Sequence, residues 1–384
     1  MKILYSHRTK SADGQYVHIR SLTDALKARG HEVIMAGPDD YGAAAPRALD
    51  AEKGVSARAF LPKPAYEAAE MLYTLRGYAR LSAAAKVAKP DIVYERYNLY
   101  YHAGVHLARA RKLPLMLEVN APLFDERSAH GGLALKPLAR MSEGAVWRAA
   151  DKVLPVTRVL ARMIEARGVA ADRIEVIPNG VDREFLSDVD STPIRRKYGL
   201  HASIVLGFTG FVRDWHGVDR ILRYIAASER PDLHLLIVGD GDARGPLERE
   251  AKVLGVERQL TFTGVVQREH VAAHVAAFDI ALQPAVVAYA SPLKLMEYMA
   301  LSRAIVAPDR DNIREILTDD VDALLAKPDD EAALHACLDA LIDDAGLRAR
   351  LGQAARASCL RQRLTWEANA EKVEKIAWSL LSRR

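Results

Sequence analysis

Residues 233–242 read Leu-His-Leu-Leu-Ile-Val-Gly-Asp-Gly-Asp. An apolar run of this length, closed by a glycine pair, is typical of a strand that is buried on both faces of a parallel sheet. Similar runs recur along the whole chain, and helical patterns separate them. Strands that alternate with helices predict parallel sheets with right-handed crossovers, which is a doubly wound α/β fold.

We expect this alternation in two successive rounds. The strands of the first round are predicted at residues 2–6, 32–36, 92–95, 115–118, 152–156 and 174–177. Those of the second are predicted at residues 204–208, 233–238, 260–263, 280–283 and 305–307. Helices are predicted at residues 21–29, 142–150, 218–227, 269–277 and 292–301, among others. A length of 384 residues predicts two domains, and the polar, turn-rich segment 182–199 predicts the link between them.

The composition narrows the classes of protein. The chain is 50% hydrophobic and 27% charged, as in folded globular proteins, and it has no apolar run of about 18 residues. Two cysteines and the lack of a secretory signal favour a cytoplasmic protein. Residues 1–187 carry 28 basic against 21 acidic residues, a net charge of +7 that favours an anionic ligand or membrane surface; scattered solvated charge is the alternative.

One candidate ligand loop is Gly207-Phe-Thr-Gly-Phe-Val-Arg-Asp-Trp-His-Gly217, which follows a predicted strand and precedes a helix. Its glycines let the backbone approach a ligand. The planar guanidinium of Arg213 is suited to two phosphate oxygens, and His216 supplies a further donor or caps the helix.

The sharpest motif is Ala290-Ser-Pro-Leu-Lys-Leu-Met-Glu-Tyr-Met-Ala300. Pro292 is expected to open a helix whose free N–H groups attract a diphosphate. Lys294 and Glu297 are three residues apart and share one helix face. A cation for phosphate and a carboxylate for sugar hydroxyls fit a nucleotide sugar. A surface ion pair is the alternative interpretation.

Three weaker signals complete the survey. The loop at residues 6–18 brings Gly14 to a helix start but lacks the three-glycine dinucleotide fingerprint. Residues 263–266 offer bare backbone amides that could contact a base edge. The segment 64–89 mixes aromatic, apolar and basic side chains, which fits either a helix that lies on a membrane or one that covers the sheet.

Taken together, Ile177-Pro-Asn-Gly-Val-Asp182, Val238-Gly-Asp-Gly241 and the motif at residues 291–300 resemble glycosyltransferase family 4, and the resemblance extends over essentially the full length. It implies the GT-B fold, two Rossmann-like domains that face each other across a cleft. These would be residues 1–187 with 365–384 on the acceptor side, and residues 188–364 on the donor side. It also implies a nucleotide-sugar donor, retained anomeric configuration and no metal or other cofactor.

The resemblance assigns roles to particular residues. Glu297 matches the second Glu of the family's Glu-x7-Glu motif and would bind ribose, whereas the first Glu is replaced by Tyr289. Arg213 and Lys294 would be the catalytic cations. Other donor contacts would come from Gly210, His216, Gly239, Val265, Val266, Tyr289, Ser291, Pro292 and Leu293. The acceptor side would include Gly14, Gln15, His18, Glu118 and Asn120.

The chain departs from the family at three further places. Phe211 and His216 stand where an Arg and a Lys are usual, and Glu118-Val-Asn120 lies where many members have His-Asp.

From the resemblance as a whole we expect a hexosyltransferase with a nucleotide diphosphate sugar as donor and a lipid-linked glycan as acceptor, acting in polysaccharide assembly at the inner face of the membrane. A sugar-nucleotide epimerase and a non-catalytic nucleotide-sugar-binding subunit are the alternatives. No motif for nucleic-acid binding is present.

Overall fold

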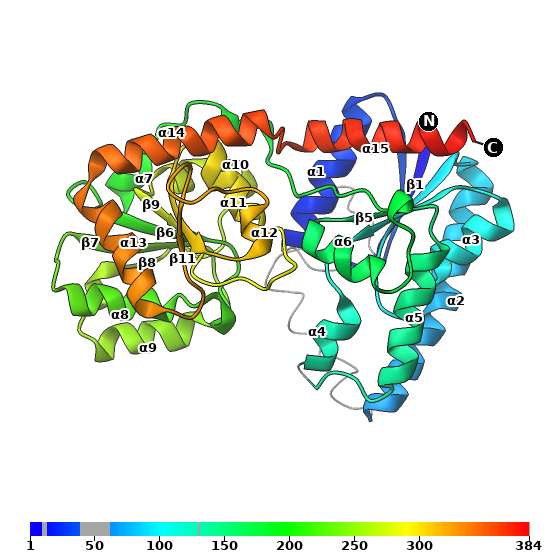
Figure 1. Ribbon diagram of the computed structural model, residues 1–384, viewed down its shortest axis with the longest axis horizontal. Coiled ribbons are helices and arrows are strands. Elements are labelled where there is room, and N and C mark those ends of the chain that lie inside the picture. Colours follow the sequence, from blue (N-terminus) through cyan, green and yellow to red (C-terminus); the bar gives the residue numbers. More distant parts are fainter. Residues whose placement is uncertain (10–13, 39–61, 130, 384) are drawn as a thin grey trace. The chain divides into compact units, whose positions relative to one another are not determined.

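A computed structural model describes residues 1–9, 14–38, 62–129 and 131–383 (Figure 1). The chain forms two compact units. Unit 1 comprises Met1–Pro178, Tyr289–Ser291 and Trp366–Arg384, and unit 2 comprises Asn179–Ala288 and Pro292–Thr365. Each unit contains a wholly parallel sheet with helices on both faces, which is the doubly wound architecture that the alternating pattern predicts.

The sheet of unit 1 has the strand order β2-β1-β3-β4-β5. Its strands are β1 (Lys2–Ser6), β2 (Glu32–Ala36), β3 (Ile92–Arg96), β4 (Leu115–Val119) and β5 (Lys152–Pro155). The central strands β3 and β4 are buried at every position, so their apolar residues face helices on both sides. The carboxyl ends of these parallel strands meet at one edge of the sheet.

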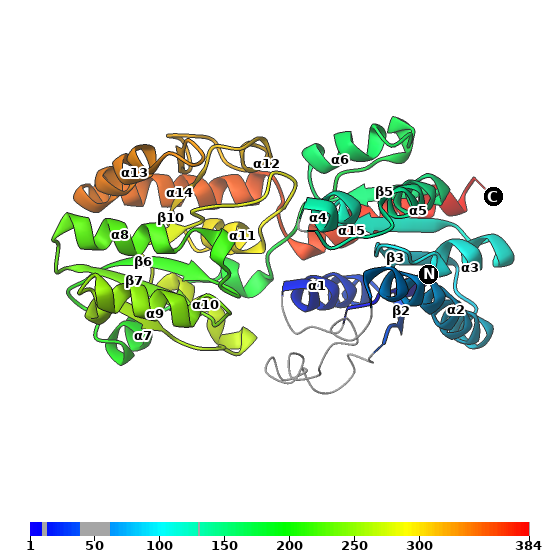
Figure 2. The same cartoon turned by 90° about the horizontal axis from the view of Figure 1, so that it is seen from below.

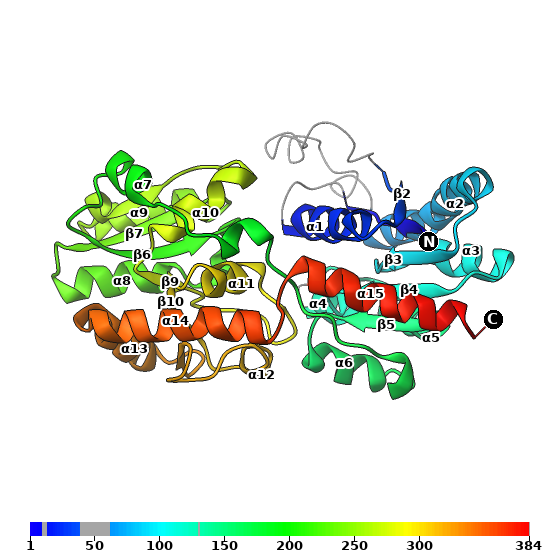
Figure 3. The same ribbon diagram turned by 90° about the horizontal axis from the view of Figure 1, so that it is seen from above.

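The helices of unit 1 are α1 (Gly14–Ala28), α2 (Lys63–Ala88), α3 (Ala103–Arg111), α4 (Leu123–Ala129), α5 (Lys136–Ala149), α6 (Arg158–Glu165) and α15 (Trp366–Leu381). The last helix of the chain, α15, belongs to unit 1 and packs along α1 (Figure 3). On the other side of the unit, α2 packs along α3 (Figure 2).

The sheet of unit 2 has the strand order β11-β10-β9-β6-β7-β8. Its strands are β6 (Ile204–Thr209), β7 (Leu233–Val238), β8 (Leu260–Phe262), β9 (Ile280–Leu282), β10 (Ala304–Pro308) and β11 (Leu324–Ala326). The strand quoted at the outset, β7, is buried at five of its six positions, as a strand covered on both faces requires.

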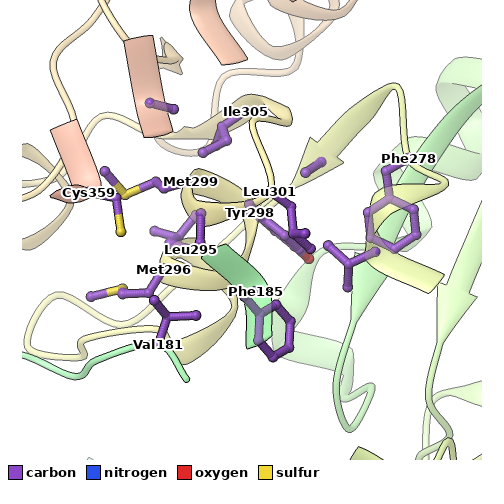
Figure 4. Close-up of a cluster of buried hydrophobic side chains, with 14 of the residues drawn as sticks. Val181, Phe185, Phe278, Leu295, Met296, Tyr298, Met299, Leu301, Ile305 and Cys359 are labelled. Atoms are coloured by element: carbon purple, nitrogen blue, oxygen red, sulfur yellow. The ribbon is translucent and has the colours of Figure 1, made fainter. Parts of the chain in front are cut away.

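The helical segments of unit 2 are the 3-10 turns Arg183–Leu186, Asp214–His216 and Glu257–Gln259, and the helices α7 (Thr192–Lys197), α8 (Asp219–Ser228), α9 (Arg244–Val253), α10 (Arg268–Ala276), α11 (Leu293–Ala300), α12 (Asp311–Arg314), α13 (Glu331–Asp343) and α14 (Ala345–Arg361). One core cluster joins the sheet to α10, α11 and α14 (Figure 4). A second joins the opposite face to α8, α9 and α13.

Alternation along the strands divides these two cores. In β6, Val205 belongs to the first cluster and Leu206 to the second, because successive side chains point to opposite faces. Gly207 is required by close packing, since a Cβ built there would lie 2.0 Å from the ring of Phe278. This contact sets β6 directly against the end of α10.

The structure corrects the expected elements in three places. Residues 174–177 are not a strand, because only one bridge forms there, between Val153 and Ile174. Strand β11, at Leu324–Ala326, lies outside the strands predicted from the sequence. Segment 182–199 is not a free linker: Phe185 is fully buried and packs into unit 2, and the division between the units falls at Pro178.

Candidate functional site

Two glycines at the carboxyl ends of β6 and β7 form the floor of the candidate site in unit 2. Gly210 and Gly239 have φ angles of +113° and +145°, which favour glycine. A Cβ on Gly239 would lie 2.1 Å from the carbonyl oxygen of Gly210, so no larger residue fits without moving the backbone. The two strand ends are therefore in direct contact and leave bare backbone at the sheet edge where ligands bind in such folds.

Lys294, in the first turn of α11, lies over this floor. Its Nζ is 3.7 Å from the centre of the Phe208 ring, and its Cε is 3.7 Å from the position that a Cβ of Gly210 would take. Among the described residues, no carboxylate lies within ion-pair distance of the amine, so Lys294 and Glu297 do not form the i, i+3 pair that spacing alone suggested. Desolvation by burial lowers the pKa of Lys294 to about 7, and the charge of Glu297 opposes this only in part.

His216 and Arg213 approach from the loop after β6. The backbone N–H of Arg213 donates to Nδ1 of His216 at 3.1 Å, which leaves Nε2 as the protonated nitrogen of a neutral ring. Burial, together with the charges of Lys294 and Arg213, lowers the pKa of His216 to about 3, so the ring is neutral at physiological pH. The His216 ring lies 5.2 Å from the Phe208 ring, beside the lysine.

The guanidinium of Arg213 stacks against two aromatic rings. It lies 4.7 Å from the ring centre of Phe211 and 5.0 Å from that of Trp215. Its nearest acidic partner, Asp242, is 3.9 Å away and exposed. Phe211, which replaces the usual arginine of the family motif, therefore supports the arginine two residues later.

Glu297 lies one turn after Lys294 and is only 6% exposed. Its Oε1 accepts a hydrogen bond of 2.5 Å from Nη1 of Arg268, the first residue of α10. The other nitrogens of that guanidinium donate to Asp182, at 2.6 and 3.1 Å. The carboxylate expected to meet ribose is thus held by a cation that lies far away in the sequence.

The remaining donor-side residues fall into two groups. Val265 is 63% exposed in the turn before α10, while Val266 packs partly against the core. Pro292 caps α11, which begins at Leu293. Tyr289 and Ser291 belong to unit 1, where the Tyr289 ring packs against the core and its carbonyl accepts a 2.9 Å hydrogen bond from the hydroxyl of Thr157.

In unit 1, Glu118 at the end of β4 is 2% exposed and is the centre of a hydrogen-bond network. It accepts from Nε2 of His18 at 3.0 Å and from Asn120 at 2.6 Å, and it pairs with Arg96. Two buried phenols, Tyr5 and Tyr94, also donate to it. Burial alone would raise its pKa, but His18 and Arg96 hold it well below the usual range. All the donors that surround this carboxylate come from the protein.

The loop before α1 supplies the exposed part of unit 1. Gly14 and Gln15 are exposed at the start of α1, and Oε1 of Gln15 accepts a 3.3 Å hydrogen bond from Thr9. The structure thus brings His18, Glu118 and Asn120 together, while Gly14 and Gln15 lie at the helix start. Residues 10–13 of this loop lie outside the described ranges.

Sequence reasoning missed Arg268, Phe208 and Trp215. Arg268 gives no local signal, because its partner Glu297 is 29 residues away and Asp182 is 86 away. Phe208 reads as an ordinary strand residue, although it supports the lysine. Trp215 is 60% exposed in the candidate loop, and an exposed tryptophan beside Arg213 was the signal that could have revealed it.

Helix α2 covers the sheet with one face and leaves apolar side chains on the other. Thr74, Leu81 and Ala85 are buried, whereas Leu72 and Leu75 are 64% and 66% exposed. Over the described ranges, no helix is both long enough and apolar enough to pass through a bilayer.

Comparison with known proteins gives two matches to family models, one in each half of the chain. Residues 13–180 match the "Glycosyl transferase 4-like domain" and residues 203–344 match "Glycosyl transferases group 1". A relative, the D-inositol 3-phosphate glycosyltransferase of Xylanimonas cellulosilytica, is 27% identical over 98% of this chain and 94% of its own.

Two solved structures share the fold over the whole length. Sucrose-phosphate synthase from Thermosynechococcus elongatus has a TM-score of 0.80 at 17% identity and covers 100% of both chains. Anabaena Alr3699/HepE, in complex with UDP-glucose, has a TM-score of 0.77 at 18% identity and covers 99% of this chain and 100% of its own. The chain therefore belongs to the glycosyltransferase group 1, or family 4-like, proteins of GT-B fold, a family that includes retaining enzymes, and it is a glycosyltransferase that takes its sugar from a nucleotide sugar.

Proposed function

We propose that the protein is a metal-independent, retaining hexosyltransferase that moves a sugar from a nucleotide diphosphate sugar to a hydroxyl of a lipid-linked glycan. The observation that carries this proposal is the desolvated amine of Lys294, which lies over the bare backbone of Gly210 and has no carboxylate partner within the described part of the chain. A cation in this state attracts an anion that arrives with a ligand. A diphosphate at the start of α11 supplies that anion.

The reaction requires the bond between the sugar's anomeric carbon and the diphosphate oxygen to break while the acceptor oxygen forms its bond on the same face. Negative charge then develops on the departing diphosphate. Lys294, Arg213 and the first turn of α11 stabilise this charge, and the neutral His216 ring donates through Nε2. The departing phosphate oxygen takes the proton of the acceptor hydroxyl. No protein nucleophile is needed.

On the donor side, Glu297 would accept the ribose hydroxyls, and the chain at Val265 and Val266 would contact the base. Gly210 and Gly239 allow the diphosphate to approach the backbone. Alr3699/HepE, whose fold this chain shares, was solved with UDP-glucose, which supports a uridine nucleotide as the first donor to examine.

On the acceptor side, Gly14, Gln15 and Asn120 are the candidate contacts in unit 1. His18 and Glu118 would position Asn120 without contacting the acceptor themselves, because Glu118 accepts hydrogen bonds from both His18 and Asn120 at the strand end. The relative from X. cellulosilytica is named for an inositol phosphate. This name supports a hydroxyl of a polyol as the group that receives the sugar.

A lipid-linked acceptor is supported by the exposed faces of α2 and α5, two helices whose buried sides meet in one apolar cluster that includes Met71 and Ala139. Exposed apolar side chains on these helices are Leu72, Leu75, Leu138 and Met141. Basic residues on the same helices are Lys63, Arg76, Lys136 and Arg140. Apolar side chains among lysines and arginines match the interface of an anionic membrane, which supports our proposal that the enzyme acts at the cytoplasmic face.

The substitution Lys294→Ala is expected to reduce kcat/KM by about 10²–10³-fold, or about 2.7–4 kcal/mol, because it removes one preorganised charge from the leaving diphosphate. Steady-state release of nucleoside diphosphate from the preferred nucleotide sugar measures this effect. Arg249→Ala, at an exposed arginine of α9, is the matched control. A Lys294→Ala variant that melts normally and keeps near-normal kcat/KM would remove Lys294 from the mechanism.

Affinity for UDP is expected to fall as the pH rises above 7. In the free protein Lys294 has a pKa of about 7, so the amine is mostly neutral at pH 8–9, whereas a bound diphosphate favours the ammonium form. Binding then takes up a proton, and the affinity drops by about tenfold per pH unit. Calorimetry between pH 7 and 9 in buffers of different ionisation enthalpy measures both effects. Lys294→Met should abolish the slope; a slope that persists in this variant would assign it to another group.

The membrane proposal predicts that the protein floats with vesicles that contain phosphatidylglycerol at low salt, and is released at high salt. The double variant Leu72→Ser/Leu75→Ser should float less, because it removes apolar contact from the outward face of α2. Val253→Ser, at an even more exposed apolar residue of unit 2, is the control and should float like the wild type. Equal flotation of all three proteins, or no flotation on anionic vesicles, would contradict the proposal.

A further inference from the structure

Arg268 contacts more acidic groups than any other cation near the donor site. Its guanidinium donates to Glu297 at 2.5 Å and to Asp182 at 2.6 and 3.1 Å, and its Nε lies 3.9 Å from Glu184. The same group lies 4.6 Å from the centre of the Phe185 ring. One cation thus faces three carboxylates and is fixed in orientation by an aromatic ring.

This arrangement constrains the Glu297 carboxylate. Oε1 is committed to Arg268, while none of the described residues donates a hydrogen bond to Oε2. A guanidinium is planar and permanently charged, so its hydrogen bond restricts the rotation of the Glu297 carboxylate. The outcome is a carboxylate with one occupied oxygen and one oxygen ready to accept.

Asp182 anchors the other arm of the guanidinium. The hydrogen bonds from Nε and Nη2 converge on one oxygen of Asp182, which stops Arg268 from swinging away from Glu297. Asp182 belongs to a segment that Val181 and Phe185 attach firmly to the core of unit 2. The orientation of Glu297 therefore depends on a packed part of the unit.

We propose that Arg268 is a positioning residue for nucleotide recognition: it presents a single oxygen of Glu297 to the hydroxyls of the donor's ribose. This inference rests on the proposed function, in which Glu297 meets the ribose. It assigns to Arg268 the selection of ribonucleotides over deoxyribonucleotides. Arg268 itself contacts no substrate, and it has no direct effect on the diphosphate.

Calorimetry on the intact protein tests this proposal with three probes: the best ligand among UDP, GDP and ADP, its 2′-deoxy counterpart, and inorganic pyrophosphate. The wild type should bind the ribonucleotide at least about tenfold more tightly than the deoxynucleotide, as expected for a lost hydrogen bond to a charged group. Arg268→Met should reduce this ratio to about threefold or less, while the affinity for pyrophosphate changes by less than about twofold. Arg268→Lys, which keeps the charge without the fork, should give an intermediate ratio.

Two further variants keep the test decisive. Asp182→Asn still offers one oxygen to Nε and Nη2 of Arg268, so Arg268 stays bonded to Glu297 and the ratio should stay near that of the wild type even if the melting temperature falls. Arg249→Met is the surface control. An unchanged ratio in Arg268→Met and Arg268→Lys would overturn the proposal, and so would an equal loss of affinity for all three probes, which is the result of a purely structural role. A wild type that binds none of the three nucleotides overturns the proposed function itself, and this inference with it.

Discussion

The chemistry of unit 2 depends on one unbalanced charge. The amine of Lys294 is withdrawn from water against the ring of Phe208, and the nearest acidic residue on its helix, Glu297, is committed to Arg268. Charging a desolvated amine that has no acidic partner costs free energy, so the neutral form is favoured until an anion binds beside it. Next to the lysine, Gly210 presents backbone without a side chain, and Gly239 packs directly against Gly210. We propose that a diphosphate completes this arrangement.

The two units treat buried charge in opposite ways. In unit 1 the carboxylate of Glu118 is surrounded by donors of the protein, so its charge is satisfied before any ligand arrives. In unit 2, none of the described residues gives Lys294 a carboxylate partner or donates a hydrogen bond to Oε2 of Glu297. We expect Lys294 and Glu297 to contact the charged donor, whereas Glu118 belongs to a hydrogen-bonded strand end in the unit whose helix start exposes Gly14 and Gln15. An acceptor hydroxyl carries no charge, so unit 1 needs only to hold it in position and does not need to supply an opposite charge.

Most of the fold could be predicted from the sequence because long apolar runs determine parallel strands. The prediction was wrong where the pattern was short or tertiary packing decided: Phe185 looked like part of a polar linker but is buried. At the site, the sequence correctly indicated that Lys294 and Glu297 share a helix face, yet it could not show that they do not pair. That depends on Arg268, whose approach to α11 is a property of the folded unit. The roles of these residues remain predictions from geometry and family resemblance.

The central claim is that side-chain cations of unit 2 bind a diphosphate without help from a divalent ion. Calorimetric titration of the full-length protein with UDP, GDP and ADP, once in EDTA and once in magnesium, tests it most directly. We predict that at least one of the three binds with the same affinity under both conditions, and that Lys294→Ala weakens it. Binding that requires magnesium, or no binding of any of the three nucleotides, would contradict this account.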